Sequence, residues 1–308
     1  MKKLHILYST NDRSRYIIRY GEYFKKELVK LPEVEVFFIK QAAYLDDLLK
    51  RMPFTPDSIF FDDFAHNYPL YGLQKCAIPK GVLYWDVQRT QQEFRKFVFQ
   101  NKINLVFSFY RDAFLSFFPE FKAKFRWLPN HVYTPIFKDY GLKKEIDYLL
   151  MGALHDSIYP LRTKIAKGMV NEKGFVLHRH PGYCDYSREE ENEALVGTAY
   201  AKTVNKAKIF FTDDSLYKFP IAKYFEVPAC NTLLLASGSA ELRDLGFIDG
   251  ETFVEINEGN YRKKARYYLQ HERKRNEIAR RGSEMVRKFH STTIRTKQFV
   301  NMVADYVF

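Results

Sequence analysis

Short apolar runs alternate with longer amphipathic stretches in the first half of the chain. The apolar runs predict strands over 5–9, 34–39, 58–62, 81–85 and 105–109. Apolar residues at helical spacing predict helices over 13–31, 41–51 and 89–100. This strand–helix alternation is typical of a parallel, doubly wound α/β sheet.

The same pattern starts again after a polar break at residues 138–145. Here the predicted strands are 146–151, 174–177, 207–212, 232–236 and 253–256. The predicted helices are 158–169, 193–205, 222–225, a basic one over 261–289, and a last one over 293–306. The sequence therefore predicts an α/β protein of two Rossmann-like domains facing a cleft. Residues 1–140 form the first, 141–290 the second, and the terminal helix 291–308 returns to the first.

The positive charge of the chain suggests an anionic binding partner. The chain has a formal net charge of +12, and residues 261–308 carry 13 Lys and Arg against 4 Asp and Glu. Such a field attracts nucleic acid, acidic lipid or a polyanionic polymer. Because much of this charge falls on a predicted helix, a solvated helix face is the competing interpretation.

Several classes of protein are disfavoured by what the sequence lacks. No apolar run approaches the ~18 residues of a membrane-spanning helix, and no signal-peptide pattern is present. We therefore expect a cytoplasmic protein. Three widely spaced cysteines suit neither a disulfide framework nor a zinc site. The phosphate-binding motif of P-loop NTPases, the dinucleotide motif Gly-x-Gly-x-x-Gly, Gly-x-Ser-x-Gly and His-Glu-x-x-His are all missing.

Adjacent aspartates occur at Asp62-Asp63 and at Asp213-Asp214. Either pair could bind a metal, but capping and turn roles are commoner for such residues.

The most informative motif lies in the second half. Residues 223–231 read KYFEVPACN and precede the Leu-rich strand 232–236. Two earlier fragments accompany it, WLPN at 127–130 and LLMGA at 149–153, with Pro-Leu-Arg at 160–162. Together these segments resemble the C-terminal domain of GT-B glycosyltransferases, specifically the spore-maturation-protein (CgeB-like) branch. The resemblance extends from about residue 146 to the end, where His290 and Arg295 match the family's terminal segment.

The resemblance implies that residues 1–140 are the acceptor-side domain and 141–290 the nucleotide-sugar domain. Glu226 matches the glutamate that accepts hydrogen bonds from the donor's ribose. The family's usual Gly after the Cys is Asn231 here, and both residues tolerate positive φ. A second glutamate common in retaining relatives is replaced by Lys218. This departure puts the donor-sugar contact and a retaining mechanism in doubt.

The diphosphate of such a donor needs positive partners. Arg162 follows the Gly152 loop at the start of a predicted helix, where free N–H groups favour anions. Lys223 begins the helix that bears Glu226, and His180 follows a predicted strand at its carboxyl end. A surface or structural role is the alternative for each of these three side chains.

An inverting transfer also needs a general base on the acceptor side. Asp62, Asp63, His66 and Asp86 lie at predicted strand ends. Asp63 with His66 could form a base and its orienting partner, and Asp86 is the alternative.

The resemblance implies a hexosyltransferase-like enzyme that uses a nucleotide-diphospho sugar, UDP-linked being one option. It implies no metal ion and no cofactor beyond the donor. The basic segments suggest a polyanionic acceptor such as modified DNA, a cell-wall polymer or a lipid-linked glycan, with peripheral contact to the inner membrane face as an option. The alternatives are a non-catalytic nucleotide- or nucleic-acid-binding protein, or an epimerase or phosphorylase of the same architecture.

Overall fold

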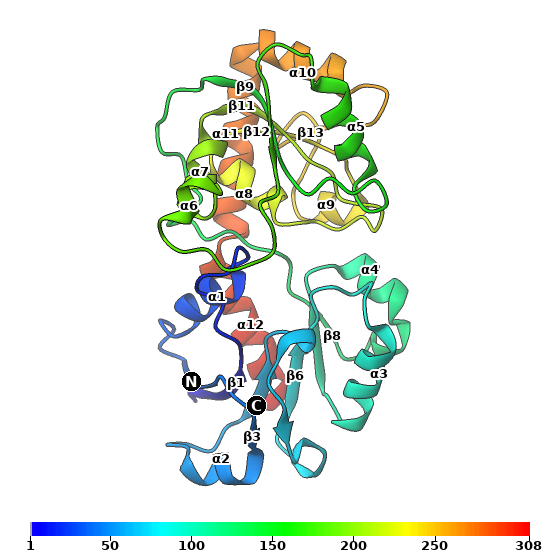
Figure 1. Ribbon diagram of the computed structural model, residues 1–308. Helices are drawn as coiled ribbons and strands as arrows, with labels where there is room; N and C mark the ends of the chain where they lie inside the picture. The colour runs from blue at the N-terminus through cyan, green and yellow to red at the C-terminus, as the bar shows by residue number, and fades with distance from the viewer. Residues whose placement is uncertain (1) are drawn as a thin grey trace. The chain divides into compact units, whose positions relative to one another are not determined.

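The computed structural model describes residues 2–308 and divides them into two compact units (Figure 1). Unit 1 holds the chain up to Ser14, Arg19–Pro129 and Thr293–Phe308. Unit 2 holds Arg15–Ile18 and Asn130–Thr292. The main division falls after Pro129, earlier than the predicted 140.

Unit 1 is built on a six-stranded parallel sheet in the order β2-β1-β4-β6-β7-β8. Its strands are β1 (Leu4–Ser9), β2 (Val34–Ile39), β4 (Ser58–Phe61), β6 (Lys80–Leu83), β7 (Leu105–Ser108) and β8 (Phe125–Trp127). The helices of this unit are α1 (Tyr20–Leu28), α2 (Leu45–Arg51), α3 (Gln91–Gln100), α4 (Arg111–Phe117) and α12 (Thr292–Val307). A separate pair of short strands is formed by β3 (Ala43–Tyr44) and β5 (Leu70–Tyr71).

Helix α12 is part of the core of unit 1, although it comes last in the sequence. Phe299 is fully buried, and its ring lies 5.5 Å from that of Phe24, 4.6 Å from that of Phe60 and 5.4 Å from that of Phe107. Rings at these separations attract each other beyond their burial alone. Unit 1 therefore includes both ends of the described chain.

Unit 2 is built on a five-stranded parallel sheet in the order β10-β9-β11-β12-β13. Its strands are β9 (Ile146–Gly152), β10 (Phe175–Arg179), β11 (Ala207–Phe211), β12 (Leu233–Ala236) and β13 (Val254–Glu255). Its helices are α5 (Pro160–Met169), α6 (Glu190–Glu193), α7 (Thr198–Asn205), α8 (Lys223–Ala229), α9 (Ala240–Asp244), α10 (Tyr261–Gln270) and α11 (Glu272–Phe289). The two parallel sheets confirm the predicted fold class of Rossmann-like domains.

Four predicted helices were wrong in extent. The helix expected over 41–51 begins only at Leu45, after the short strand β3, and the one expected over 193–205 begins only at Thr198. The helix expected over 13–31 begins only at Tyr20, because backbone groups of residues 15–17 bond instead to the loop 184–186. The basic helix expected over 261–289 is two helices, interrupted at His271 with φ −100° and ψ 69°. In the described residues, no helix is both long enough and apolar enough to cross a membrane.

Candidate functional site

The site in unit 2 is centred on Gly152, the last residue of β9. Gly152 has a φ of +140°, which other residues rarely adopt. A Cβ there would lie 3.2 Å from Lys223 Cε and 3.3 Å from Arg162 Nη1. Three elements, β9, α5 and α8, thus bring a bare backbone turn and two cations together at the carboxyl edge of the sheet. Ligands of open parallel sheets bind at this edge.

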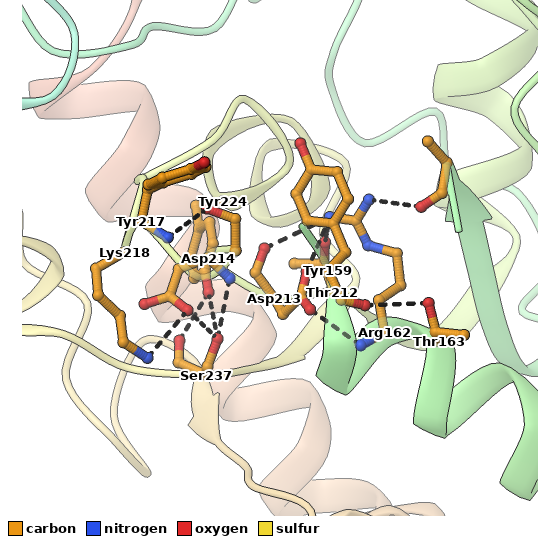
Figure 2. Close-up of polar contacts among 12 residues, drawn as sticks. Tyr159, Arg162, Thr163, Thr212, Asp213, Asp214, Tyr217, Lys218, Tyr224 and Ser237 are labelled. Atoms are coloured by element: carbon orange, nitrogen blue, oxygen red, sulfur yellow. Dashed lines mark hydrogen bonds and ion pairs between the residues drawn. The ribbon is translucent and has the colours of Figure 1, made fainter. Parts of the chain in front are cut away.

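Arg162 is fixed in place by buried partners (Figure 2). Its Nη1 donates to Ala153 O and its Nη2 to Thr212 Oγ1, both at 3.1 Å. Nη2 also lies 3.1 Å from Asp213 Oδ1, and the Arg162 N–H donates to Asp213 Oδ2 at 3.0 Å. The guanidinium stacks over the Tyr159 ring at 3.9 Å. Asp213 therefore offsets much of the charge of Arg162.

Lys223 is the cation of this group whose charge is not offset in this way. It is the first residue of α8 and is partly buried. No hydrogen bond or ion pair of its amino group is found within residues 2–308, and the nearest described aromatic contact is the Tyr200 ring at 5.7 Å. Burial lowers the pKa of Lys223 to about 8, with Glu226 opposing the shift and Arg162 adding to it. An anion bound at Gly152 would favour the charged form of the Lys223 amine and raise its pKa.

His180 follows β10 and is affected by the positive charges of Lys223 and Arg162. Burial first, and then the charges of Lys223, Arg162 and His155, lower the pKa of His180 to about 4. Its ring stacks on Tyr183 at 4.3 Å between centroids. With this pKa the His180 ring is neutral at pH 7.

Glu226 lies one helical turn after Lys223 and is 8% exposed. Burial and the Glu226 carboxylate together raise the pKa of the Tyr200 hydroxyl. Helix α8 ends at Ala229, and Asn231, two residues later, is in the left-handed region at φ +53°, a conformation that Gly also adopts readily. The Asn231 amide also donates to Asp139 Oδ2 at 2.8 Å.

Lys218 takes no part in the group around Gly152 through any contact described for residues 2–308. It has a φ of +58°, and its 62% exposed side chain lies 3.7 Å from Asp214 Oδ1. Ser237 Oγ donates to the same carboxylate at 2.6 Å. Figure 2 shows the adjacent aspartates directed to different partners, Asp213 to Arg162 and Asp214 to Ser237 and Lys218. Burial raises the pKa of Asp214 to about 6.

In unit 1, Asp63 and His66 form a pair after β4. His66 Nδ1 lies 2.7 Å from Asp63 Oδ2, and the Asp63 side chain is almost fully buried while that of His66 is 63% exposed. The hydrogen bond to Asp63 raises the pKa of His66, with burial opposing the shift. With Nδ1–H donating to Asp63, Nε2 is left to accept a proton, the arrangement of a base and its orienting carboxylate.

The remaining predicted acids of unit 1 have other surroundings. Asp86 is exposed and lies 3.9 Å from Arg89. Asp62 is buried, accepts a hydrogen bond from Thr10 Oγ1, and has its pKa raised to about 7 by burial. Asp63 also accepts from the Ala65 N–H at 2.9 Å, a capping contact. Within the part of the chain that the structure describes, no group of three His, Cys, Asp or Glu side chains is placed to hold a metal ion.

Sequence reasoning missed several residues of these sites. The sequence shows that Asp213 follows a predicted strand, but nothing in the sequence indicates that it pairs with Arg162. Arg13 donates from Nη2 to Asp63 Oδ2 at 2.7 Å and lay inside a predicted helix, so no signal marked it. Trp85, whose ring lies under the Arg13 guanidinium at 5.0 Å, was likewise unmarked.

Comparison with known proteins agrees with this architecture. Residues 155–301 match the family model described as glycosyl transferase-like. No curated protein matches the chain in sequence. The matched residues include Arg162, His180, Lys223 and Glu226.

Solved structures with the same fold include three that cover nearly the whole chain. Sucrose-phosphate synthase from Thermosynechococcus elongatus matches with a TM-score of 0.65 at 11% identity, over 99% of both chains. Anabaena HepE in complex with UDP-glucose matches with a TM-score of 0.60 at 11% identity, over 98% of this chain and 100% of that one. An alpha-glucosyltransferase in complex with UDP and DNA matches with a TM-score of 0.64 at 10% identity, over 99% and 100%. The fold is therefore of the GT-B type.

Proposed function

We propose that the protein is a glycosyltransferase that moves a sugar from a UDP-linked donor to a hydroxyl of an acceptor. The observation that carries the proposal is Lys223. Its partly buried amine lies beside the bare backbone of Gly152 and has no anionic partner at hydrogen-bond distance among residues 2–308. The glycosyl transferase-like match covers this residue. UDP is the nucleotide to test first, because HepE was solved with UDP-glucose and the alpha-glucosyltransferase of the same fold with UDP.

In this proposal the donor diphosphate lies against Gly152. Lys223 provides the charge, and Arg162, fixed by Asp213, provides a rigid set of N–H donors beside it. Glu226 accepts hydrogen bonds from the ribose, as the resemblance to the CgeB-like branch implies. A preorganised positive site of this kind stabilises the negative charge that develops on a departing diphosphate.

The Asp63–His66 pair would act as the base of an inverting transfer. His66 Nε2 takes the proton of the acceptor hydroxyl while the oxygen of that hydroxyl attacks the anomeric carbon of the donor sugar. The bond from that carbon to the diphosphate oxygen breaks, and its electron pair leaves with UDP. Asp63 stabilises the imidazolium formed. In this scheme no residue forms a covalent bond to the sugar, and no metal is required.

The acceptor that we propose is polyanionic, and the basic C-terminal helices support this only in part. Glu172 pairs with Arg266 at 2.7 Å, and within α11 Arg280 pairs with Glu284 at 2.6 Å and Arg281 with Glu277 at 2.5 Å. These pairs reduce the field, while the other exposed cations of α11 are Arg273, Lys274, Arg287 and Lys288. Binding to DNA, to a cell-wall polymer or to acidic vesicles at the inner membrane face should therefore weaken steeply with salt.

The first test is calorimetric binding of UDP to the parent protein and to two lysine variants. Lys223→Ala should weaken UDP binding at least tenfold, since a charged contact to phosphate is lost. Lys173→Ala is the matched control, because Lys173 is exposed and precedes β10, at the amino end of that strand and not at the carboxyl end where Gly152 lies. Equal affinities of all three proteins would refute the donor site.

The second test separates transfer from binding. Release of UDP from UDP-sugars with candidate acceptors should be abolished in His66→Gln, whereas this variant should still bind UDP. Lys218, the departure from the family pattern, favours the alternative of a non-catalytic nucleotide-binding protein. Tight UDP binding with no release of UDP from any donor and acceptor combination would favour that alternative.

A further inference from the structure

A single loop of the chain passes from unit 1 into unit 2 and back. The loop after β1 leaves unit 1 at Ser14, and residues 15–18 belong to unit 2. There the Ile17 N–H donates to Cys184 O at 3.2 Å, and the Tyr186 N–H donates to Arg15 O at 2.9 Å. Backbone hydrogen bonds of this kind fix position irrespective of side chains.

The segment bound by residues 15–17 is the loop that begins with His180. The Gly182 N–H donates to His180 Nδ1 at 3.1 Å, and Tyr183 stacks on the His180 ring. The Tyr186 hydroxyl donates to Gly182 O at 3.4 Å. Residues 180–186 are thus held together as one loop, and His180 at its start lies within the field of Lys223.

The other end of this segment is anchored in unit 1 by Arg13. Its N–H donates to Glu22 Oε1 at 2.8 Å, and its Nη2 donates to Asp63 Oδ2 at 2.7 Å. The same carboxylate oxygen lies 2.7 Å from His66 Nδ1. The guanidinium also lies over the Trp85 ring. Arg13 and His66 therefore share one acceptor atom.

We propose that residues 13–17 form a strap that links the loop 180–186 to the Asp63–His66 pair, with Arg13 as the positioning residue. The inference rests on the proposed function, because it takes the donor site to be at Gly152 and the base to be His66. Binding of UDP beside His180 shifts the loop 180–186 and the residues bonded to it. This movement reaches Arg13, a few residues earlier in the chain, and changes its hydrogen bond to Asp63. By thermodynamic linkage, the protonation state of His66 in return changes the affinity for UDP.

The charged groups that face His66 are Asp63, Arg13 and Asp86. Asp63 and Asp86 raise the pKa of His66, whereas Arg13 lowers it. Loss of the Arg13 charge should therefore raise the pKa of His66 and move the rise of transfer activity to higher pH. Because these groups are partly exposed, we expect a change of roughly half a pH unit.

The experiment is NMR titration of the His66 ring, assigned by its loss in His66→Gln, with and without saturating UDP. In the parent protein, UDP should move the His66 midpoint. Ile17→Pro removes the N–H that bonds to Cys184 and should abolish this UDP effect while UDP still binds. Ile17→Ala keeps that N–H and is the matched control, in which the UDP effect should persist.

A second pair of variants keeps the test valid if Ile17→Pro does not fold. Arg13→Gln should raise the His66 midpoint and make it insensitive to UDP, and Arg13→Lys should restore part of both. An equal UDP effect in the parent, Ile17→Pro and Arg13→Gln proteins overturns the strap alone, as does UDP binding to the parent without any change at His66. Failure of the parent to bind UDP overturns the proposed function and the strap together.

Discussion

Raising the pH should weaken UDP binding, because Lys223 titrates near pH 8 in the free protein. A bound diphosphate favours the charged amine and raises its pKa, so the complex holds more protons than the free protein above that pH. Affinity is therefore full below pH 8 and falls as the pH rises through that value. With a free pKa of about 8, the fraction of charged Lys223 falls about tenfold between about pH 7 and pH 9. The dissociation constant should rise by the same factor, or about 1.4 kcal/mol.

Calorimetry checks this dependence directly. Titrations with UDP between pH 7 and pH 9 should follow this curve. In buffers of different ionisation heat near pH 8, binding should take up a fraction of a proton. Lys223→Met should bind more weakly at pH 7 and show a flat profile. A flat profile in the parent protein, or an equal slope in Lys223→Met, would show that the amine does not contact the diphosphate.

Three further predictions concern side chains that the fold holds in place. Gly152→Ala should leave the circular dichroism spectrum unchanged but weaken UDP binding more than tenfold, because the added Cβ meets Lys223 and Arg162 at a φ of +140°. Asp213→Asn should lower the free energy of unfolding in urea by about 3–5 kcal/mol, since it leaves the buried Arg162 charge without its partner; an unchanged midpoint would contradict this pairing. Phe299→Ala should cost about 3–5 kcal/mol in unit 1. Calorimetry should then show a separate early transition that UDP does not shift, and a single transition protected by UDP would argue against it.

The alternation of apolar and amphipathic segments was enough to predict most strands. The segment 58–62 was predicted as a strand, and β4 spans Ser58–Phe61. Strands buried on both faces read as short continuous apolar runs, so this signal is local and strong. The helix over 13–31 was wrong for the opposite reason. Its apolar spacing is helical, but hydrogen bonds to residues 184–186 override that preference over residues 15–17.

The residue types of the candidate site were also accessible from the sequence, because Lys223 and Glu226 lie in one recognisable helical motif. The sequence did not predict which of these side chains lie next to one another. That Lys223 and Arg162 meet at Gly152, and that Asp213 offsets Arg162, depend on β9 and β11 lying side by side.

The sequence by itself determined the α/β fold class and the order of most strands and of the longer helices. The tertiary structure alone decided which cation has no carboxylate at hydrogen-bond distance among the described residues, which His shares a carboxylate oxygen with Arg13, and where residues 15–18 bond to unit 2. The physical reason is that periodicity follows from contacts near in sequence. Charge pairing and pKa depend on burial and on partners that only folding brings together.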